Sequence, residues 1–129
     1  MDRLNVMVVD DSSLVAKIVV GSLVQLKHRV VAVAPTGAAA IAAYPTCMPD
    51  VVLMDITMPD MDGIAATEAI VKSYPDVRII IITSHGDESV IARAMKAGAK
   101  GYIRKPFSVE KLRLALADVV KAEFAPAKA

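Results

Sequence analysis

Cysteine, tryptophan and long apolar runs are scarce in this sequence. Cys47 is the only cysteine, so no disulfide within the chain can form, and a small apolar core residue is its natural interpretation. No apolar run reaches the ~20 residues that a membrane-spanning helix needs, and Asp10 and Asp11 interrupt the short apolar run near the N-terminus. These absences predict a soluble, cytoplasmic protein without membrane insertion.

The net charge of the chain is small as well. The 15 basic and 14 acidic residues leave a formal net charge of +1, so no bulk field directs the chain to nucleic acid, a membrane surface or an acidic substrate. Direct binding of nucleic acid is therefore not expected, and any charge-dependent function must be local. Hydrophobic residues, in contrast, make up 55% of the 129 residues, which suits the buried core of one globular domain.

Short apolar runs alternate with stretches of helical periodicity along the chain. The runs predict five strands, at residues 6–9, 29–34, 51–54, 78–83 and 101–103. Helices are predicted between and after them, at 14–26, after 37, from about 63, at 88–97 and at 109–121. Ser12 or Ser13, Asp87 and Ser108 stand where helix N-caps are expected, and Gly98 stands at a helix C-terminus.

Repeated strand and helix units indicate how these elements assemble. Strands that are apolar on both faces predict a parallel sheet with helices on both faces, joined by right-handed crossovers. The fold class is therefore α/β, with a doubly wound, five-stranded parallel sheet. We expect one domain over residues 1–122, and a flexible tail or the start of a linker at 123–129, where Ala, Pro and Lys dominate.

Chemically reactive side chains stand at the carboxyl ends of four predicted strands. Asp10 and Asp11 follow the first strand and Asp55 follows the third, while Thr83 ends the fourth and Lys105 follows the fifth. Each acid taken alone is readily explained as a turn or cap residue. Because ligands of open parallel sheets bind beyond the carboxyl ends of the strands, their convergence from four strands favours a functional site.

Three carboxylates that lie a few ångströms apart require a cation, or a raised pKa of at least one of them. Two carboxylates about 4 Å apart repel each other by roughly 4 kcal/mol at an effective dielectric constant near 20. Carboxylate oxygens select hard cations, and a site with few protein ligands suits Mg²⁺ better than Ca²⁺. A nucleophilic carboxylate, a divalent ion, a lysine and a hydroxyl group together fit phosphoryl transfer.

The motifs around these residues resemble the receiver domain of bacterial response regulators, and the chemotaxis type in particular. The resemblance covers residues 4 to about 121 and rests on Val8-Val9-Asp10-Asp11-Ser12, Met54-Asp55-Ile56-Thr57-Met58-Pro59 with Asp62-Gly63, Ile82-Thr83-Ser84 and Arg104-Lys105-Pro106-Phe107. It implies the flavodoxin-like strand order 2-1-3-4-5. It also implies a two-component signalling switch that catalyses only its own phosphorylation and dephosphorylation.

The resemblance assigns a role to each residue of the predicted site. Asp55 would be the phosphoryl acceptor, and Mg²⁺ would be held by Asp10, Asp11, Asp55 and the carbonyl oxygen of Thr57. Thr83 and Lys105 would act with Asp55 in catalysis by binding the phosphoryl group.

Further roles follow from the same resemblance. Thr83 and Tyr102 would form the conformational switch, and the Lys105-Pro106 peptide bond would be cis. His85 and Thr57 would modulate the rate of dephosphorylation. From the residues themselves, Asp60 and Asp62 are interpreted as turn acids that add to the negative rim, and His28 is expected at a surface or helix end without a function.

The partners implied by the resemblance are a phosphoryl donor and a downstream target. The donor would be a histidine kinase or a phosphotransfer protein, and the target would bind the face formed by the fourth helix, the fifth strand and the fifth helix. A stand-alone, single-domain regulator is the favoured interpretation. The alternative within the family is a receiver domain cut from a longer regulator with an output domain.

Two other functions share parts of the pattern. A flavodoxin-type flavoprotein has the same architecture, but it needs a Ser-, Thr- or Gly-rich phosphate cradle after the first strand, where this chain has Asp10 and Asp11. An aspartyl-phosphate phosphatase is closer in chemistry, but that class has two acids separated by one residue at this point. The adjacent acids of this chain therefore favour the receiver domain over both.

Overall fold

The computed structural model describes residues 3–56, 58, 62–84 and 88–124 of the chain, and their elements alternate as predicted. The strands are β1 (Asn5–Val9), β2 (Arg29–Ala34), β3 (Val51–Asp55), β4 (Ile79–Thr83) and β5 (Gly101–Arg104). The helices are α1 (Ser13–Gln25), α2 (Gly37–Cys47), α3 (Gly63–Ser73), α4 (Glu88–Ala97) and α5 (Val109–Phe124). Within the described residues no helix is long and apolar enough to cross a membrane.

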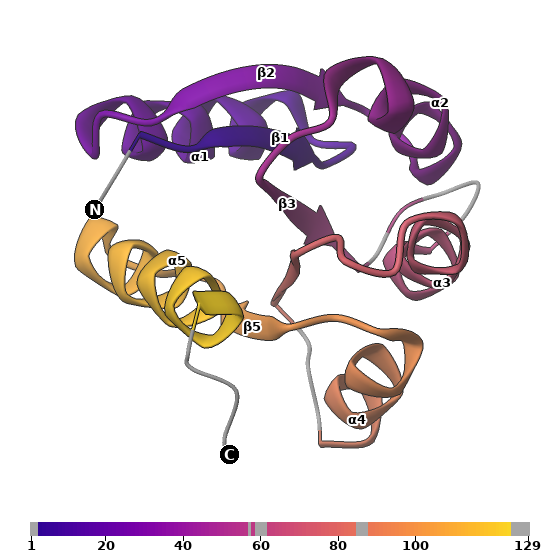
Figure 1. The fold of residues 1–129 in the computed structure, drawn as a ribbon. Helices are drawn as coiled ribbons and strands as arrows, with labels where there is room; N and C mark the ends of the chain where they lie inside the picture. Colours follow the sequence, from indigo (N-terminus) through magenta and orange to yellow (C-terminus); the bar gives the residue numbers. More distant parts are fainter. Residues whose placement is uncertain (1–2, 57, 59–61, 85–87, 125–129) are drawn as a thin grey trace.

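The five strands form one parallel sheet in the order β2-β1-β3-β4-β5, which confirms the predicted fold class and strand order. Helices α1 and α5 cover one face of the sheet, and α2, α3 and α4 cover the other (Figure 1). Strand order reverses direction between β1 and β3, so the turns after these two strands lie side by side at one edge of the sheet.

Strand β4 is buried on both faces of the sheet, as predicted for a strand of continuous apolar sequence. Successive side chains of a strand point to opposite sides of the sheet. Ile79 and Ile81 accordingly join the core under α2, α3 and α4, whereas Ile80 and Ile82 join the core under α1 and α5. All four isoleucines are buried, so β4 holds the two cores together beneath the predicted site.

Side-chain caps fix where the helices begin. The Ser12 hydroxyl oxygen accepts a hydrogen bond from the Val15 N–H (3.2 Å), and the Ser108 hydroxyl oxygen accepts one from the Lys111 N–H (3.0 Å). These contacts confirm two of the predicted N-caps, while Asp87 lies outside the described residues. Gly98 follows α4 with φ +118°, the conformation that a C-terminal glycine supplies.

The surface position predicted for His28 is wrong, although the residue lies just beyond the C-terminal end of α1, as the predicted helix-end position requires. Its side chain is buried, and its Nδ1 atom accepts a hydrogen bond from the Leu4 N–H (3.0 Å). Burial lowers the pKa of His28 below its ordinary value, because desolvation disfavours the charged imidazolium. The residue is thus a neutral structural acceptor at the start of β1, and its position between Lys27 and Arg29 in the sequence concealed this role.

Candidate functional site

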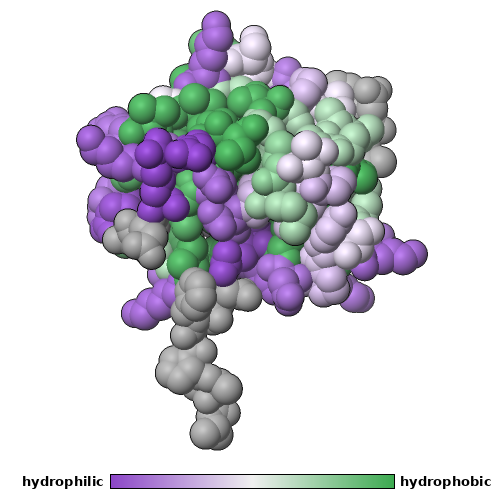
Figure 2. Space-filling model, turned by 45° about the horizontal axis from the view of Figure 1, so that its top comes forward, coloured by the Kyte–Doolittle hydropathy of each residue, from purple (hydrophilic) through white to green (hydrophobic). Residues whose placement is uncertain are grey.

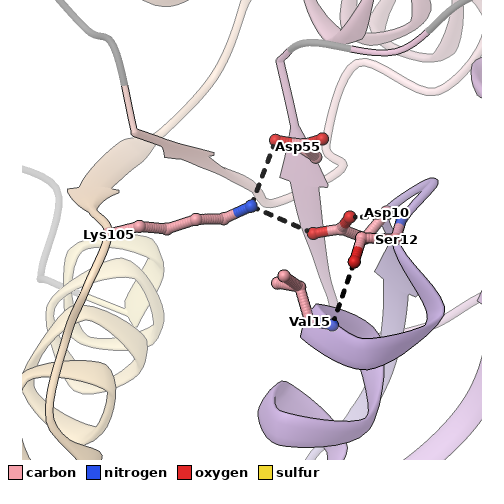
Figure 3. A network of polar contacts seen from close by, with 5 residues as sticks. All are labelled: Asp10, Ser12, Val15, Asp55 and Lys105. Atoms are coloured by element: carbon pink, nitrogen blue, oxygen red, sulfur yellow. Dashed lines mark hydrogen bonds and ion pairs between the residues drawn. The ribbon is translucent and has the colours of Figure 1, made fainter.

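A lysine and two buried aspartates form the centre of the predicted site (Figure 3). The Lys105 ammonium lies 3.2 Å from Oδ2 of Asp10 and 3.4 Å from Oδ1 of Asp55. The three residues come from the ends of β5, β1 and β3, so the fold brings them together across 95 residues of sequence. Only 20% of the Lys105 side chain is exposed, which places this charge inside the site rather than over solvent.

The orientation of Asp10 is set by the turn that leads into α1. Its backbone N–H donates to the Ala34 carbonyl oxygen (3.0 Å) and thereby extends the pairing of β1 with β2. Its Oδ1 atom accepts a hydrogen bond from the Ser12 N–H (2.9 Å), which leaves Oδ2 for Lys105. The same Ser12 caps α1 (Figure 3), so the helix start and the carboxylate orientation depend on one short turn.

Asp11 completes an acidic cluster with Asp10 and Asp55. One carboxylate oxygen from each residue lies within 4.8 Å of the other two, and Asp11 is exposed while the other two are buried. An oxygen-only group of this size has the donor chemistry that Mg²⁺ and other hard cations prefer. The described residues can therefore hold a cation from the solvent side of the site.

The electrostatics of Asp55 also fit a cation. Burial raises the pKa of this carboxyl above its ordinary value, and the charges of Asp10 and Asp11 raise it further, whereas the Lys105 ammonium lowers it. The balance is an increase, so one lysine does not fully offset burial and two neighbouring acids. A divalent cation would supply the missing positive charge. The charge balance at Asp55 therefore fits the Mg²⁺ ion that the sequence predicts.

Gly63 allows α3 to begin directly against the end of β3. A Cβ atom on this residue would lie 2.1 Å from the backbone oxygen of Asp55, and its N–H donates to the Ile56 carbonyl oxygen (2.7 Å). Asp62 caps the same helix, since its Oδ1 accepts a hydrogen bond from the Ala65 N–H (2.8 Å). Sequence reasoning interpreted the Asp62-Gly63 pair as a turn before a helix and missed this close approach.

Thr83 lies at the same edge of the sheet, at the buried end of β4. Its carbonyl oxygen accepts a hydrogen bond from the Lys105 N–H (2.8 Å), so the backbones that carry these two residues are joined. The Lys105-Pro106 peptide bond is cis, as predicted. Tyr102 lies in β5 opposite Ile81, with 45% of its surface exposed.

The structure thus brings together Asp10, Asp11, Asp55 and Lys105, and it places Thr83 at the same edge of the sheet. Thr57, His85 and Asp60 lie outside the described residues, and the roles predicted for them remain predictions. The position of the Lys105 ammonium is explained by the two carboxylates of this chain that it binds.

Comparison with known proteins identifies the family. The response regulator receiver domain family matches residues 6–117. "Chemotaxis protein CheY" of Thermotoga maritima is 36% identical over 116 residues, which are 90% of this chain and 97% of that protein. "Transcriptional regulatory protein DegU" of Brevibacillus brevis is 33% identical over 112 residues, which are 86% of this chain and 48% of that protein.

A solved structure agrees in fold. A chain from the CheX-CheY-BeF3-Mg²⁺ complex of Borrelia burgdorferi has a TM-score of 0.87 and 30% sequence identity, with 90% of this chain and 88% of that chain covered. Receiver domains of this kind are signalling switches rather than enzymes in the usual sense. The chain belongs to the response regulator receiver domains of two-component systems.

Proposed function

We propose that this receiver domain is switched by phosphorylation of Asp55. The observation that carries the proposal is the placement of one buried carboxylate between a lysine ammonium at 3.4 Å and two further acids that could share a cation with it. The raised pKa of Asp55 means that its charge is poorly compensated in the metal-free protein, and a nucleophilic carboxylate must carry that charge to react.

The donor in this proposal is a histidine kinase or a phosphotransfer protein with a phosphorylated histidine. An Oδ atom of Asp55 attacks the phosphorus atom, the new P–O bond forms, and the P–N bond breaks so that its electron pair returns to the imidazole. Asp10, Asp11, Asp55 and the Thr57 carbonyl oxygen are the proposed Mg²⁺ ligands. Bound Mg²⁺ would neutralise charge on the carboxylates and on the transferred phosphoryl group.

Lys105 lies where its ammonium can bind Asp55 before the transfer and the phosphoryl group after it. Its ammonium binds Asp55 before the reaction, and a phosphoryl group on Asp55 adds acceptor oxygens and negative charge at the same place. Thr83 would donate its hydroxyl group to those oxygens. The Borrelia complex contains BeF3, which resembles a phosphoryl group, together with Mg²⁺, and this supports the proposal for a related fold.

The signal would pass from Thr83 to the face formed by α4, β5 and α5. Among the side chains that the structure describes, each of these elements exposes one large apolar group: Met95 is 40% exposed, Tyr102 45% and Leu114 47%. We propose that Thr83 and Tyr102 change together on phosphorylation, so that this face binds the downstream target differently. Because β5 carries Tyr102 and leads directly into Lys105, the switch and the site share one strand.

The proposal includes a stand-alone, cytoplasmic regulator. Its domain was predicted at residues 1–122 with a tail at 123–129, but α5 continues to Phe124, so the first two residues of that predicted tail belong to the last helix. The match to 97% of the Thermotoga CheY supports the stand-alone regulator. The match to 48% of the Brevibacillus DegU keeps the alternative of a longer regulator with an output domain. The molecular mass of the protein isolated from its own cells would decide between the two.

Intact mass spectrometry tests the phosphorylation proposal. The protein is incubated with Mg²⁺ and acetyl phosphate, and the wild type is compared with Asp55→Asn, with a sample containing EDTA, and with Asp118→Asn as a control on the exposed side of α5. We expect one added phosphoryl group in the wild type and the control, and none in the other two samples. Unchanged labelling of Asp55→Asn would contradict the assignment of the acceptor.

A further inference from the structure

The charges of this domain are unevenly distributed. Residues 12–49 contain no Asp or Glu and three cations, Lys17, Lys27 and Arg29. Since the whole chain has a net charge of +1, this segment contributes +3 and the rest of the chain contributes −2. The segment forms α1, β2 and α2, so these three elements carry basic side chains and no acidic ones, and such asymmetry indicates a partner of opposite charge.

The same side exposes apolar surface along the junction of α1 with β2, which we call the α1–β2 seam. Val24 on α1 is 59% exposed and Val33 on β2 is 50% exposed. Figure 2, in which the side carrying β2 and α2 comes forward, shows hydrophobic surface gathered there and hydrophilic surface around it. Apolar surface that is rimmed by polar residues is typical of interaction sites.

Two hollows lie on the seam, one near each end of β2. The first has a volume of about 740 Å³ and is lined by Arg3, Val24, Leu26, Lys27, His28, Arg29 and Val30. The second has a volume of about 200 Å³ and is lined by Ser13, Ala16, Lys17, Val20 and Val33. Each hollow therefore combines valine side chains with at least one cation, so each can take an apolar group with a carboxylate beside it.

The cations of the seam are available to a partner. The ion pairs of the described residues join Lys105 to two aspartates and Arg113 to Glu110, and none of them involves Arg3, Lys17, Lys27 or Arg29. All four of these side chains are exposed. Carboxylates of a partner could thus pair with them without displacing an acid of this chain within the described residues.

The spacing of the hollows fits a helix. Val30 and Val33 belong to different hollows. Val30 pairs with Val6 and Val33 pairs with Val8, because Val31 is an extra residue on β2, so the two valines are about 7 Å apart along the strand. Residues i and i+4 of a helix lie on one face and are about 6 Å apart. Two apolar side chains of one helix, one turn apart, therefore match both hollows.

The edge of β2 disfavours a strand as the occupant. The register of β1 with β2 shifts between Val6 and Met7, which leaves Val31 as an extra residue on the outer strand. The Val31 carbonyl oxygen lies 3.9 Å from the Cys47 sulfur. A bulge on an edge strand interrupts the regular ladder that an added strand needs.

We propose that the α1–β2 seam binds an amphipathic helix of a partner protein, with two apolar side chains at i and i+4 and Asp or Glu residues flanking them. A second copy of this chain would bring Lys17 and Arg29 near their own counterparts, so it lacks the required charge. Four cations also fall at the low end of the clusters that bind anionic membranes, which contain 4–8. The seam lies across the sheet from the α4–β5–α5 face and does not involve Asp55.

A designed peptide pair tests the proposal. The first peptide is a helix of ~18 residues, or five turns, with two leucines four residues apart and glutamates on both sides of them; in the second, every glutamate is replaced by lysine. Binding to the ¹⁵N-labelled protein is followed by NMR titration. We expect the glutamate peptide to shift signals of α1 and β2 and to bind at least about ten-fold more tightly than the lysine peptide.

Three protein variants locate the contact. Lys17→Glu with Arg29→Glu should weaken binding of the glutamate peptide by about ten-fold, since two attractions become repulsions, and both residues are exposed, so the fold is kept. Val33→Lys should abolish binding. Glu68→Lys, at an exposed position on α3, should bind like the wild type. Amide spectra of each variant show that it is folded.

Several outcomes would overturn the proposal. These are equal binding of the two peptides, signal shifts confined to other elements, and no binding at millimolar peptide. Binding to vesicles with anionic lipids but not to the peptide would assign the seam to a membrane surface instead. Dimerisation by analytical ultracentrifugation that Val33→Lys abolishes, without peptide binding, would assign it to a second copy.

Discussion

Replacement of Lys105 by methionine removes the one cation that the described structure places between two buried carboxylates. The side chains of Asp10 and Asp55 are only 4% and 9% exposed, so water compensates little for the loss. In the metal-free protein this substitution should therefore be far more costly than the loss of an ordinary surface lysine, which usually changes stability by less than about 0.5 kcal/mol.

The size of the effect follows from the two contacts. At 3.2 Å and 3.4 Å each ion pair has a Coulomb energy of about 5 kcal/mol at an effective dielectric constant near 20. Part of this is offset because the ammonium no longer has to be desolvated, and removal of one partner from a buried pair usually costs about 3–5 kcal/mol.

Protonation limits that cost. A carboxyl with an ordinary pKa near 3.9 can be neutralised at pH 7 for about 4.2 kcal/mol and at pH 5 for about 1.5 kcal/mol. Once the lysine is gone, Asp55 escapes its uncompensated charge by binding a proton. We therefore expect Lys105→Met to lower the free energy of unfolding by about 3–4 kcal/mol at pH 7 and by about 1.5 kcal/mol at pH 5.

Urea unfolding with EDTA present, at both pH values, measures this difference. Lys111→Met, which removes an exposed lysine from α5, serves as the control and should unfold like the wild type. A loss below about 1 kcal/mol at pH 7 would refute the reasoning, because it is the cost expected of an exposed pair. A loss of the same size at both pH values would refute the protonation step.

Three further predictions are also tested by unfolding, the first two with urea and the third with heat. Asp55→Asn should stabilise the metal-free protein at pH 7, because the raised folded-state pKa makes this carboxylate destabilising above that pKa. The gain in unfolding free energy should vanish as the pH falls toward the ordinary value of 3.8. A gain that stays constant with pH would contradict the argument. Gly63→Ala should lower the free energy of unfolding by at least about 3 kcal/mol, since its Cβ would meet the Asp55 backbone oxygen at 2.1 Å. Gly21→Ala, whose Cβ would have nothing within 4 Å, should instead stabilise α1 by about 0.5–1 kcal/mol. Equal effects of the two substitutions would be evidence against the close approach. Mg²⁺ should raise the melting temperature of the wild type, and Asp11→Asn should reduce that increase, so an unchanged increase would remove Asp11 from the metal site.

The fold was predictable because its main signal is local. Four consecutive isoleucines in β4 favour a strand that is buried on both faces of a sheet, and the alternation of such runs with amphipathic helices indicates parallel strands. The convergence of Asp10, Asp55 and Lys105 followed from the rule that the carboxyl ends of parallel strands share one edge.

Features that depend on distances between segments were not predictable in this way. The close approach of Gly63 to the end of β3 is a property of two backbones, and the dipeptide Asp62-Gly63 indicates only a turn. The burial of His28 arises because the Leu4 N–H needs an acceptor where β1 begins, and residues 24 positions apart do not show such a need. The raised pKa of Asp55 likewise depends on how burial and three charged neighbours balance.

Mapping of the phosphorylated residue tests the central proposal most directly. After incubation with Mg²⁺ and acetyl phosphate, borohydride reduction converts an aspartyl phosphate to homoserine, and mass spectrometry of proteolytic fragments locates it. We predict homoserine at position 55 alone, and none when EDTA is present. Homoserine at position 10, 11 or 62, or equal yield with EDTA, would contradict Asp55 as the magnesium-dependent acceptor.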